Sequence, residues 1–183
     1  VIFTSDKGPA GGPFPDPEFF DASGGLRVLK VSFYEGGIRV PFIARWPRHI
    51  QAGSESDHVL YFPDVMPTMG ELAGISPDLS QSSDGLSFLP ALLGLDQQQK
   101  HEYMYWEDAG YHRTPPYEML EKTLQQAVLL NEDWKAVKNG PEAPLELYHL
   151  PSDMLEENNI AGKNPDMVRK ALLVMEREHQ PAP

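Results

Sequence analysis

The sequence predicts an α/β fold in which the edge of a main sheet is joined to a small antiparallel sheet with a C-terminal helix. Three observations carry this prediction. The short apolar run over residues 1–4 is typical of a buried strand in a parallel sheet. Three strand-like runs, at 126–130, 134–138 and 145–148, are separated by turn residues and indicate an antiparallel meander. Residues 164–175 have the apolar spacing of an amphipathic helix.

Residues 1–100 are expected to form part of the larger α/β domain. After the first strand, residues 8–25 are rich in glycine, proline and aspartate and predict a long loop, a kind of segment that is often functional. Residues 34–37, Tyr-Glu-Gly-Gly, predict a turn, and a second strand over 38–46 is expected to follow it. Because the chain opens inside a predicted strand, we expect it to be part of a longer fold.

A helix is predicted over residues 64–74. It has an early proline, a Thr68-x-x-Glu71 spacing suited to a capping box, and Gly74 as a stop signal. Residues 75–100 are expected to be an irregular surface loop, because they contain serine and glutamine clusters without periodicity.

Residues 101–183 are expected to form a small C-terminal α+β subdomain, which an aromatic strand at 103–106 opens. Its closing helix has Asn164 as a candidate cap and Pro165 at the first position. Four apolar side chains are predicted to share its inner face: Val168, Ala171, Leu172 and Met175.

Composition excludes several classes of function. The 183 residues contain 27 acidic and 15 basic side chains, for a net charge of -12, which disfavours general nucleic-acid binding. No apolar run is long enough to predict a membrane span. The absence of cysteine excludes disulfides, thiolate metal sites and cysteine nucleophiles within these residues. Between residues 27 and 49, however, five basic residues and one acid give a local charge of +4, which suits either a solvated surface or an anion-binding mouth.

Few residues indicate chemistry on spacing alone. Asp6 follows the first predicted strand, where open α/β sheets place ligands and metals, although a strand-end aspartate is also a common turn residue. The six histidines are not spaced as metal-binding pairs on one helix turn. Ser87 lacks the second glycine of a nucleophile elbow, so we interpret it as a loop or capping hydroxyl.

The ordered set of motifs resembles the C-terminal portion of the sulfatase family, in particular arylsulfatase-like enzymes of the alkaline phosphatase superfamily. The most specific of them is Tyr34-Glu35-Gly36-Gly37-Ile38-Arg39-Val40-Pro41. The matching stretches run through the chain in the family's order and include residues 1–6, 16–20, 26–30, 45–47, 64–74, 84–87, 105–107, 126–128, 134–135 and 146–159.

The resemblance implies an alkaline-phosphatase-like fold and a sulfuric ester hydrolase. In that family a formylglycine, made from a cysteine or serine, attacks sulfur, and calcium (Ca²⁺) held by oxygen ligands neutralises the sulfate oxygens. Asp6 falls on the family's metal-binding aspartate, and Lys30 on the catalytic lysine that contacts the sulfate. Glu35, Gly36, Gly37 and Arg39 are expected to be structural, with the charged pair fixing the turn.

Two main departures from the family bear on function, and two smaller ones accompany them. The smaller ones are Val28, where the family usually has a glycine, and Leu129, where a basic residue is common. Lys7 stands at the position of the family's asparagine metal ligand, and an ammonium has no lone pair to offer calcium while it is charged. The Cys/Ser-x-Pro-x-Arg motif that yields formylglycine does not occur, so we expect the fragment alone to be inactive, with nucleophile and most calcium ligands coming from an N-terminal part.

The resemblance leaves three hypotheses open. The chain is the C-terminal part of a sulfatase acting on sulfated carbohydrate or aryl sulfate, a catalytically inactive module that binds an anionic glycan or a partner, or a phosphodiesterase of the same superfamily. We also expect a partner chain or homo-oligomer to cover the exposed sheet edge. A periplasmic or secreted location is expected from the family alone.

Overall fold

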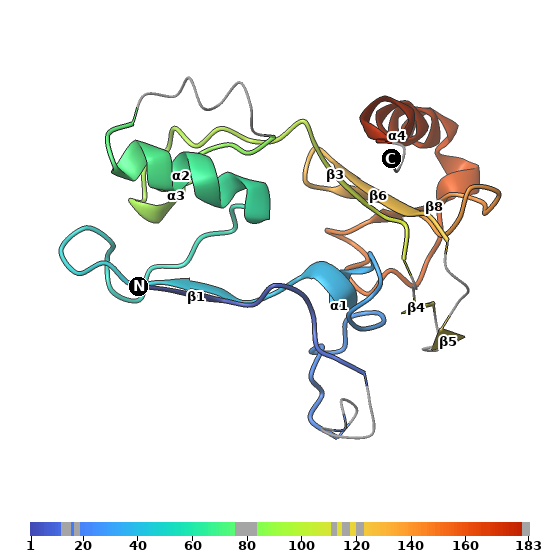
Figure 1. Cartoon of the computed structure of the whole chain (residues 1–183), viewed down its shortest axis with the longest axis horizontal. Coiled ribbons are helices and arrows are strands. Elements are labelled where there is room, and N and C mark those ends of the chain that lie inside the picture. The colour runs from blue at the N-terminus through green and yellow to red at the C-terminus, as the bar shows by residue number, and fades with distance from the viewer. Residues whose placement is uncertain are drawn as a thin grey trace. The chain divides into compact units, whose positions relative to one another are not determined.

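The computed structural model describes residues 1–11, 16, 19–75, 84–110, 113–114, 118–119 and 123–180 (Figure 1). Parts of the two predicted loops, 12–15, 17–18 and 76–83, lie outside the described residues. The chain forms two compact units. The first comprises Val1–Thr4 and Phe42–Glu102, and the second comprises Ser5–Pro41 and Tyr103–Pro183. The division into domains at residue 100 stays a prediction.

In its described residues the first unit contains a two-stranded sheet and three short helical segments. Strand β1 (Ile2–Thr4) pairs antiparallel with β2 (Phe42–Ala44). The expectation of a buried strand in a parallel sheet is not met within the described residues, where Ile2 and Phe3 are 40% and 62% exposed. A run of four apolar residues carries no information about the direction or identity of the partner strand, which explains the error. The second strand is also shorter than predicted, because α1 (Glu35–Ile38) occupies the preceding residues.

The helix predicted over residues 64–74 is confirmed as α2 (Val65–Leu72), which follows the 3₁₀ turn η1 (Phe62–Asp64). Gly74 has a φ of +69° and ends it as predicted. The Thr68–Glu71 capping box is wrong: Thr68 lies inside the helix, and its hydroxyl donates to the Asp64 carbonyl oxygen at 2.7 Å. The Asp64 carboxylate accepts the Tyr61 amide instead, because the 3₁₀ turn moves the start of the helical segment upstream.

The predicted irregular loop contains the short helix α3 (Leu89–Leu92). Ser87 is a loop hydroxyl, one of its two expected roles: its oxygen accepts the Leu89 amide at 3.2 Å just before α3, and its proton is donated to the Glu71 carboxylate. No helix in the described part of the chain is both long enough and apolar enough to cross a membrane.

The second unit is built on a four-stranded antiparallel sheet in the order β3-β6-β7-β8. The strands are β3 (Tyr103–Asp108), β6 (Gln125–Leu130), β7 (Trp134–Lys138) and β8 (Glu146–His149). They confirm the predicted aromatic strand and the predicted meander, whose strands are joined by short turns. A separate two-stranded ribbon pairs β4 (Arg113–Thr114) with β5 (Glu118–Met119). Together with the helices, these strands confirm the α/β class with a small antiparallel sheet and a C-terminal helix.

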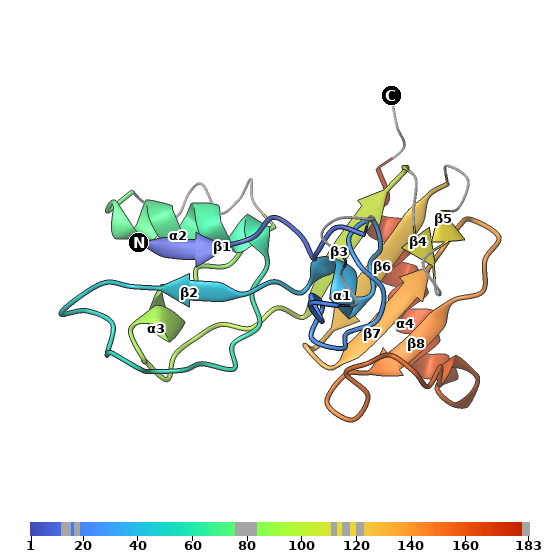
Figure 2. The same ribbon diagram turned by 90° about the horizontal axis from the view of Figure 1, so that it is seen from below.

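Both faces of this sheet are covered, as Figures 1 and 2 show from two directions. Helix α4 (Pro165–Glu178) packs on one face, and α1 lies on the other with the segment 26–34. Strand β6 is therefore buried along its whole length. The α4 face is formed by Val128, Leu130, Ala136, Leu147, Ala171, Val174 and Met175, and the opposite face by Val28, Tyr34, Ala127, Val137 and Tyr148.

Two details of the predicted C-terminal helix are wrong. Leu172 is 41% exposed, whereas Val174 is buried, because the contact stripe continues on the other side of Ala171 and Met175. The Asn164 side chain does not cap the helix, since its amide donates back to the Ile160 carbonyl oxygen at 3.0 Å. Pro165 begins the helix as predicted.

Candidate functional site

Two of the five basic residues in the window at residues 27–49 are used inside the protein. Arg27 donates to the Tyr148 hydroxyl at 2.6 Å and to the Glu156 carbonyl oxygen at 2.7 Å, and its guanidinium lies 4.1 Å from the Tyr34 ring centre. Arg39 donates to the Glu35 carboxylate at 2.7 Å, which confirms the predicted structural pair. These two arginines are therefore committed to contacts within the second unit.

Lys30 differs from both arginines. It is half-buried, and its backbone amide donates to the Pro9 carbonyl oxygen at 3.0 Å. Within the described residues its ammonium makes no ion pair. Arg45 and Arg48 are exposed in the other unit, so Lys30 is the cation that this window leaves available for an anion in the second unit.

The backbone on both sides of Lys30 is strained. Val28 has a φ of +61° and Val31 a φ of +73°, a left-handed conformation that β-branched residues rarely adopt. Such residues cost about 1–3 kcal/mol each and persist only where the surroundings hold them in place. The glycine that the sulfatase resemblance places at position 28 would adopt this conformation without strain.

Gly36 and Gly37 allow α1 to pack directly against the backbone carbonyl groups of the segment around Lys30. A Cβ on Gly36 would lie 2.4 Å from the Val28 carbonyl oxygen, and one on Gly37 would lie 2.2 Å from that of Ser32. A Cβ on Gly8 would lie 2.0 Å from the carbonyl oxygen of Gly36. The predicted turn is a four-residue helix, α1, because packing against these carbonyls, rather than a positive φ, sets the need for glycine.

The predicted metal-site residues lie on the segment next to α1. The Gly8 amide donates to the Gly37 carbonyl oxygen at 2.9 Å, and the Pro9 carbonyl accepts the Lys30 amide. The structure therefore brings the backbone that carries Asp6 and Lys7 beside the backbone that carries Lys30. The Asp6 side chain is 78% exposed, and its Oδ2 lies 3.6 Å from the Lys7 Nζ.

These residues do not by themselves fit a calcium site. Calcium takes six to eight oxygen ligands, and Asp6 supplies one carboxylate that is already paired with an ammonium. Among the residues that the structure describes, no group of three or more histidine, cysteine, aspartate or glutamate side chains could hold a metal ion. The role of Asp6 as a metal ligand stays a prediction.

A buried ionic cluster lies behind α1. The Lys135 side chain is 0% exposed, and its Nζ lies 2.7 Å from Glu35 Oε1 and 4.0 Å from Glu156 Oε1. The Glu156 Oε2 accepts the Glu35 backbone amide at 2.7 Å. Burial alone would raise the pKa of Glu35, but Lys135 and Arg39 lower it to about 2. Burial raises the pKa of Glu156 to about 7 despite the nearby Lys135.

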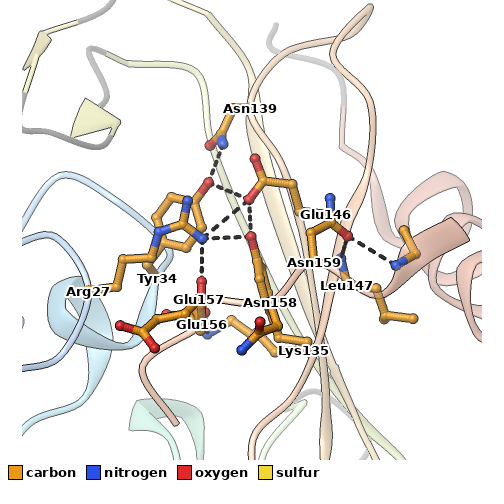
Figure 3. A network of polar contacts seen from close by, with 12 residues as sticks. Arg27, Tyr34, Lys135, Asn139, Glu146, Leu147, Glu156, Glu157, Asn158 and Asn159 are labelled. Carbon is orange, nitrogen blue, oxygen red and sulfur yellow. Dashed lines mark hydrogen bonds and ion pairs between the residues drawn. The ribbon is translucent and has the colours of Figure 1, made fainter. Parts of the chain in front are cut away.

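A second polar network joins the same segment to the sheet (Figure 3). The Tyr34 hydroxyl donates to Glu146 at 2.8 Å and accepts the Asn139 amide at 2.9 Å. The Tyr148 hydroxyl also donates to Glu146, beside Arg27. Burial raises the pKa of both tyrosines, so neither hydroxyl is suited to proton transfer near neutral pH.

Sequence reasoning did not single out the roles of Lys135, Glu146 and Glu156. Their types are those of ordinary surface residues, and their partners lie about a hundred residues away along the chain. The available signal is the strand alternation in β7, which places Lys135 on the same sheet face as buried Val137.

The matching family model settles the relationship. A model described as N-sulphoglucosamine sulphohydrolase, C-terminal, matches residues 28–178, which include Lys30, α1 and the whole sheet of the second unit. The chain belongs to the sulfatase family. The ulvan-active sulfatase of Formosa agariphila is 32% identical over 162 residues, which cover 75% of this chain and 31% of that protein. The human N-acetylgalactosamine-6-sulfatase is 39% identical over 93 residues, covering 51% of this chain and 17% of that protein.

Solved structures agree with this sulfatase relationship. The crystal structure of Ps i-CgsB is 26% identical, with a TM-score of 0.68, and the match covers 96% of this chain and 35% of that one. The structure of BT1596, a 2-O GAG sulfatase, is 27% identical with a TM-score of 0.62, covering 81% of this chain and 31% of that one. The alkaline-phosphatase-like fold class is thereby confirmed. This chain spans about a third of the length of these proteins.

Proposed function

We propose that this sulfatase chain is the C-terminal part of an enzyme that hydrolyses sulfate esters, in which Lys30 binds the sulfate group. The observation that carries the proposal is the state of Lys30: a half-buried cation that pairs with no acid among the described residues, on strained backbone that packs closely against glycines. Strained and closely supported backbone is typical of functional sites.

The chemistry suits a lysine. A sulfate ester is an anion, and negative charge on its oxygens grows as the bond to the leaving oxygen breaks. A fixed ammonium aimed at those oxygens stabilises this charge, and removing one such donor typically costs about 10²–10³-fold in rate. The formylglycine that supplies the nucleophile in this family would lie outside this chain, since the chain has no cysteine and no Cys/Ser-x-Pro-x-Arg motif. We therefore propose that these residues alone are inactive.

The proposed substrate is a sulfated carbohydrate or an aryl sulfate. The names of the relatives, an ulvan-active sulfatase and an N-acetylgalactosamine-6-sulfatase, support the carbohydrate. We also propose a periplasmic or secreted location, and a partner segment or second chain over the exposed apolar side chains of β1. We propose that calcium is held mainly by residues outside this chain, with Asp6 as the contribution from these residues.

The test uses the complete gene product that contains these residues. Sulfate release is measured from 4-nitrophenyl sulfate and from sulfated oligosaccharides, whose desulfated products are identified. It is compared with hydrolysis of bis-4-nitrophenyl phosphate. The proposal predicts sulfate release, with a loss on chelation that added calcium restores. Phosphodiester hydrolysis without sulfate release would select the phosphodiesterase instead.

A specific observation favours a second candidate, a non-catalytic module that binds an anionic glycan. Lys7 pairs with Asp6, which weakens the predicted metal position, and it adds one positive charge relative to an asparagine at the same place, beside the backbone of the Lys30 segment. This candidate predicts binding of sulfated polysaccharide that weakens with salt, without turnover in the complete gene product. Sulfate release by the complete gene product would rule it out.

A further inference from the structure

Helix α1 connects the buried ionic cluster to the segment that carries Lys30. On the sheet side, the Glu35 carboxylate pairs with Lys135 of β7. On the other side, the Gly36 amide donates to the Arg27 carbonyl oxygen at 3.0 Å, and the Gly36 Cα packs against the carbonyls of residues 26–28. A movement of α1 relative to the sheet would therefore move the backbone that presents Lys30.

Glu156 holds the first residue of α1 from a loop that follows β8. Its carboxylate accepts the Glu35 amide at 2.7 Å, and its side chain is 0% exposed. Its φ of +54° is a left-handed conformation that is uncommon for glutamate. The backbone is thus held in an unfavourable conformation while it directs a carboxylate into the protein. The Glu156 carbonyl oxygen also accepts Arg27, which fixes a second point of the Lys30 segment.

The groups that face Glu156 come from three elements. Lys135 approaches from β7, Glu35 from α1, and Arg27 from the segment before Lys30. Arg39 pairs with Glu35 on its more exposed side. The close ion pair of Lys135 is with Glu35 at 2.7 Å, which leaves Glu156 Oε1 at 4.0 Å and without a hydrogen bond. Of the two buried carboxylates, Glu156 is the less well compensated.

We propose that Glu156 is a positioning residue for Lys30, acting through the Glu35 amide and α1, and that its ionisation loosens the Lys30 segment. This inference rests on the proposed role of Lys30 in binding the sulfate. It assigns to the loop after β8 a part in the site, although Glu156 touches neither Lys30 nor Asp6 in the described structure.

The direction of the effect follows from linkage. Burial raises the pKa of Glu156 to about 7 in the closed state, whereas opening to water would return it towards its ordinary value of 4.5. Ionisation therefore favours opening, and the closed state binds the proton more tightly. With these two pKa values, the opening equilibrium rises by about tenfold between pH 6 and pH 8.

Hydrogen exchange of the complete gene product tests this directly. Protection factors, corrected for the intrinsic pH dependence of exchange, are measured between pH 6 and 8 for peptides that cover residues 26–37. We expect protection to fall by up to about tenfold in the wild type. The α4 peptide is an internal control, since its amides do not depend on Glu156. Unchanged protection over 26–37 would overturn the proposal.

Two variants distinguish the effect of Glu156 ionisation from a structural effect of the substitution. Glu156→Gln keeps an oxygen acceptor for the Glu35 amide and mimics the neutral acid, so protection should stay high and independent of pH. Glu157→Gln makes the same chemical change at an exposed neighbour and should behave as the wild type. A pH dependence that persists in Glu156→Gln would overturn the assignment to Glu156.

Measurements of kcat/KM test whether the position of Lys30 depends on Glu156. Glu156→Ala should lower kcat/KM for the sulfate ester by at least tenfold, and Glu156→Gln should recover most of that loss. Loss in both variants to the same extent would indicate a requirement for charge rather than position and would overturn the proposal. If the wild type releases no sulfate but shows the pH-dependent exchange, the proposed function fails while the control of the Lys30 segment by Glu156 stands.

Discussion

Substitution of Gly36 by alanine tests how tightly the Lys30 segment is held. The added Cβ would lie 2.4, 2.5 and 2.9 Å from the carbonyl oxygens of Val28, Arg27 and Leu26, roughly 1 Å inside normal contact. Relief requires α1 and the segment to separate, which breaks the bond from the Gly36 amide to Arg27. Overpacking costs about 1–3 kcal/mol and an unsatisfied buried amide about as much again, so we expect a loss of about 2–6 kcal/mol.

The assay is thermal and urea unfolding of Gly36→Ala beside Gly162→Ala. Gly162 lies in the 3₁₀ turn η3 (Ala161–Lys163), where a Cβ would meet nothing within 4 Å. Its variant should stay within about 0.5 kcal/mol of the wild type. The loss at Gly36 corresponds to about 10 °C in Tm for a chain of this size. Equal stability of the two variants would refute the close packing of α1 on the Lys30 backbone.

Three further changes follow from the same contacts. Lys135→Met leaves Glu35 with Arg39 alone and removes the ammonium nearest to Glu156, so unfolding should become easier by about 3–5 kcal/mol. A smaller loss than for exposed Lys170→Met would contradict the buried pair. Folding raises the pKa of Glu156 from 4.5 to about 7. Its contribution to the unfolding free energy is therefore greatest below about pH 4.5 and declines as pH rises through 7, by at most about 3 kcal/mol. The difference in unfolding free energy between Glu156→Gln and the wild type should grow from pH 5 to 8, and a difference that is constant with pH would speak against the raised pKa. Val31→Gly should raise the unfolding free energy by about 1 kcal/mol because it relieves a left-handed valine, whereas destabilisation would mean that the strain is absent.

Local patterns in the sequence were sufficient for most of the second unit. Alternation and turn residues predict β6, β7 and β8, and helix punctuation predicts α2 and α4. What they miss is the second covered face of the sheet, because the segment 26–38 that covers it is irregular and has no periodicity. The exposure of Leu172 and the burial of Val174 show the same limit, since helical spacing alone does not fix the centre of the buried stripe.

The candidate site was predictable only in part. The motif that contains Glu35, Gly36 and Gly37 was found from its resemblance to sulfatases, and the structure adds the reason for its glycines, which is contact with backbone carbonyls. Lys135 and Glu156 were not found as members of the site, because a charged residue in sequence gives no sign of burial until its distant partner is known. The basic window was predicted as one surface, but its arginines at 27 and 39 are paired internally.

The central claim is that Lys30 binds the sulfate group of the substrate. The most direct measurement is kcat/KM for sulfate release from 4-nitrophenyl sulfate by the complete gene product, compared between the wild type, Lys30→Met and the exposed control Lys170→Met. We predict a loss of about 10²–10³-fold for Lys30→Met, with folding intact, and no change for Lys170→Met. Turnover by Lys30→Met within twofold of the wild type would contradict the claim.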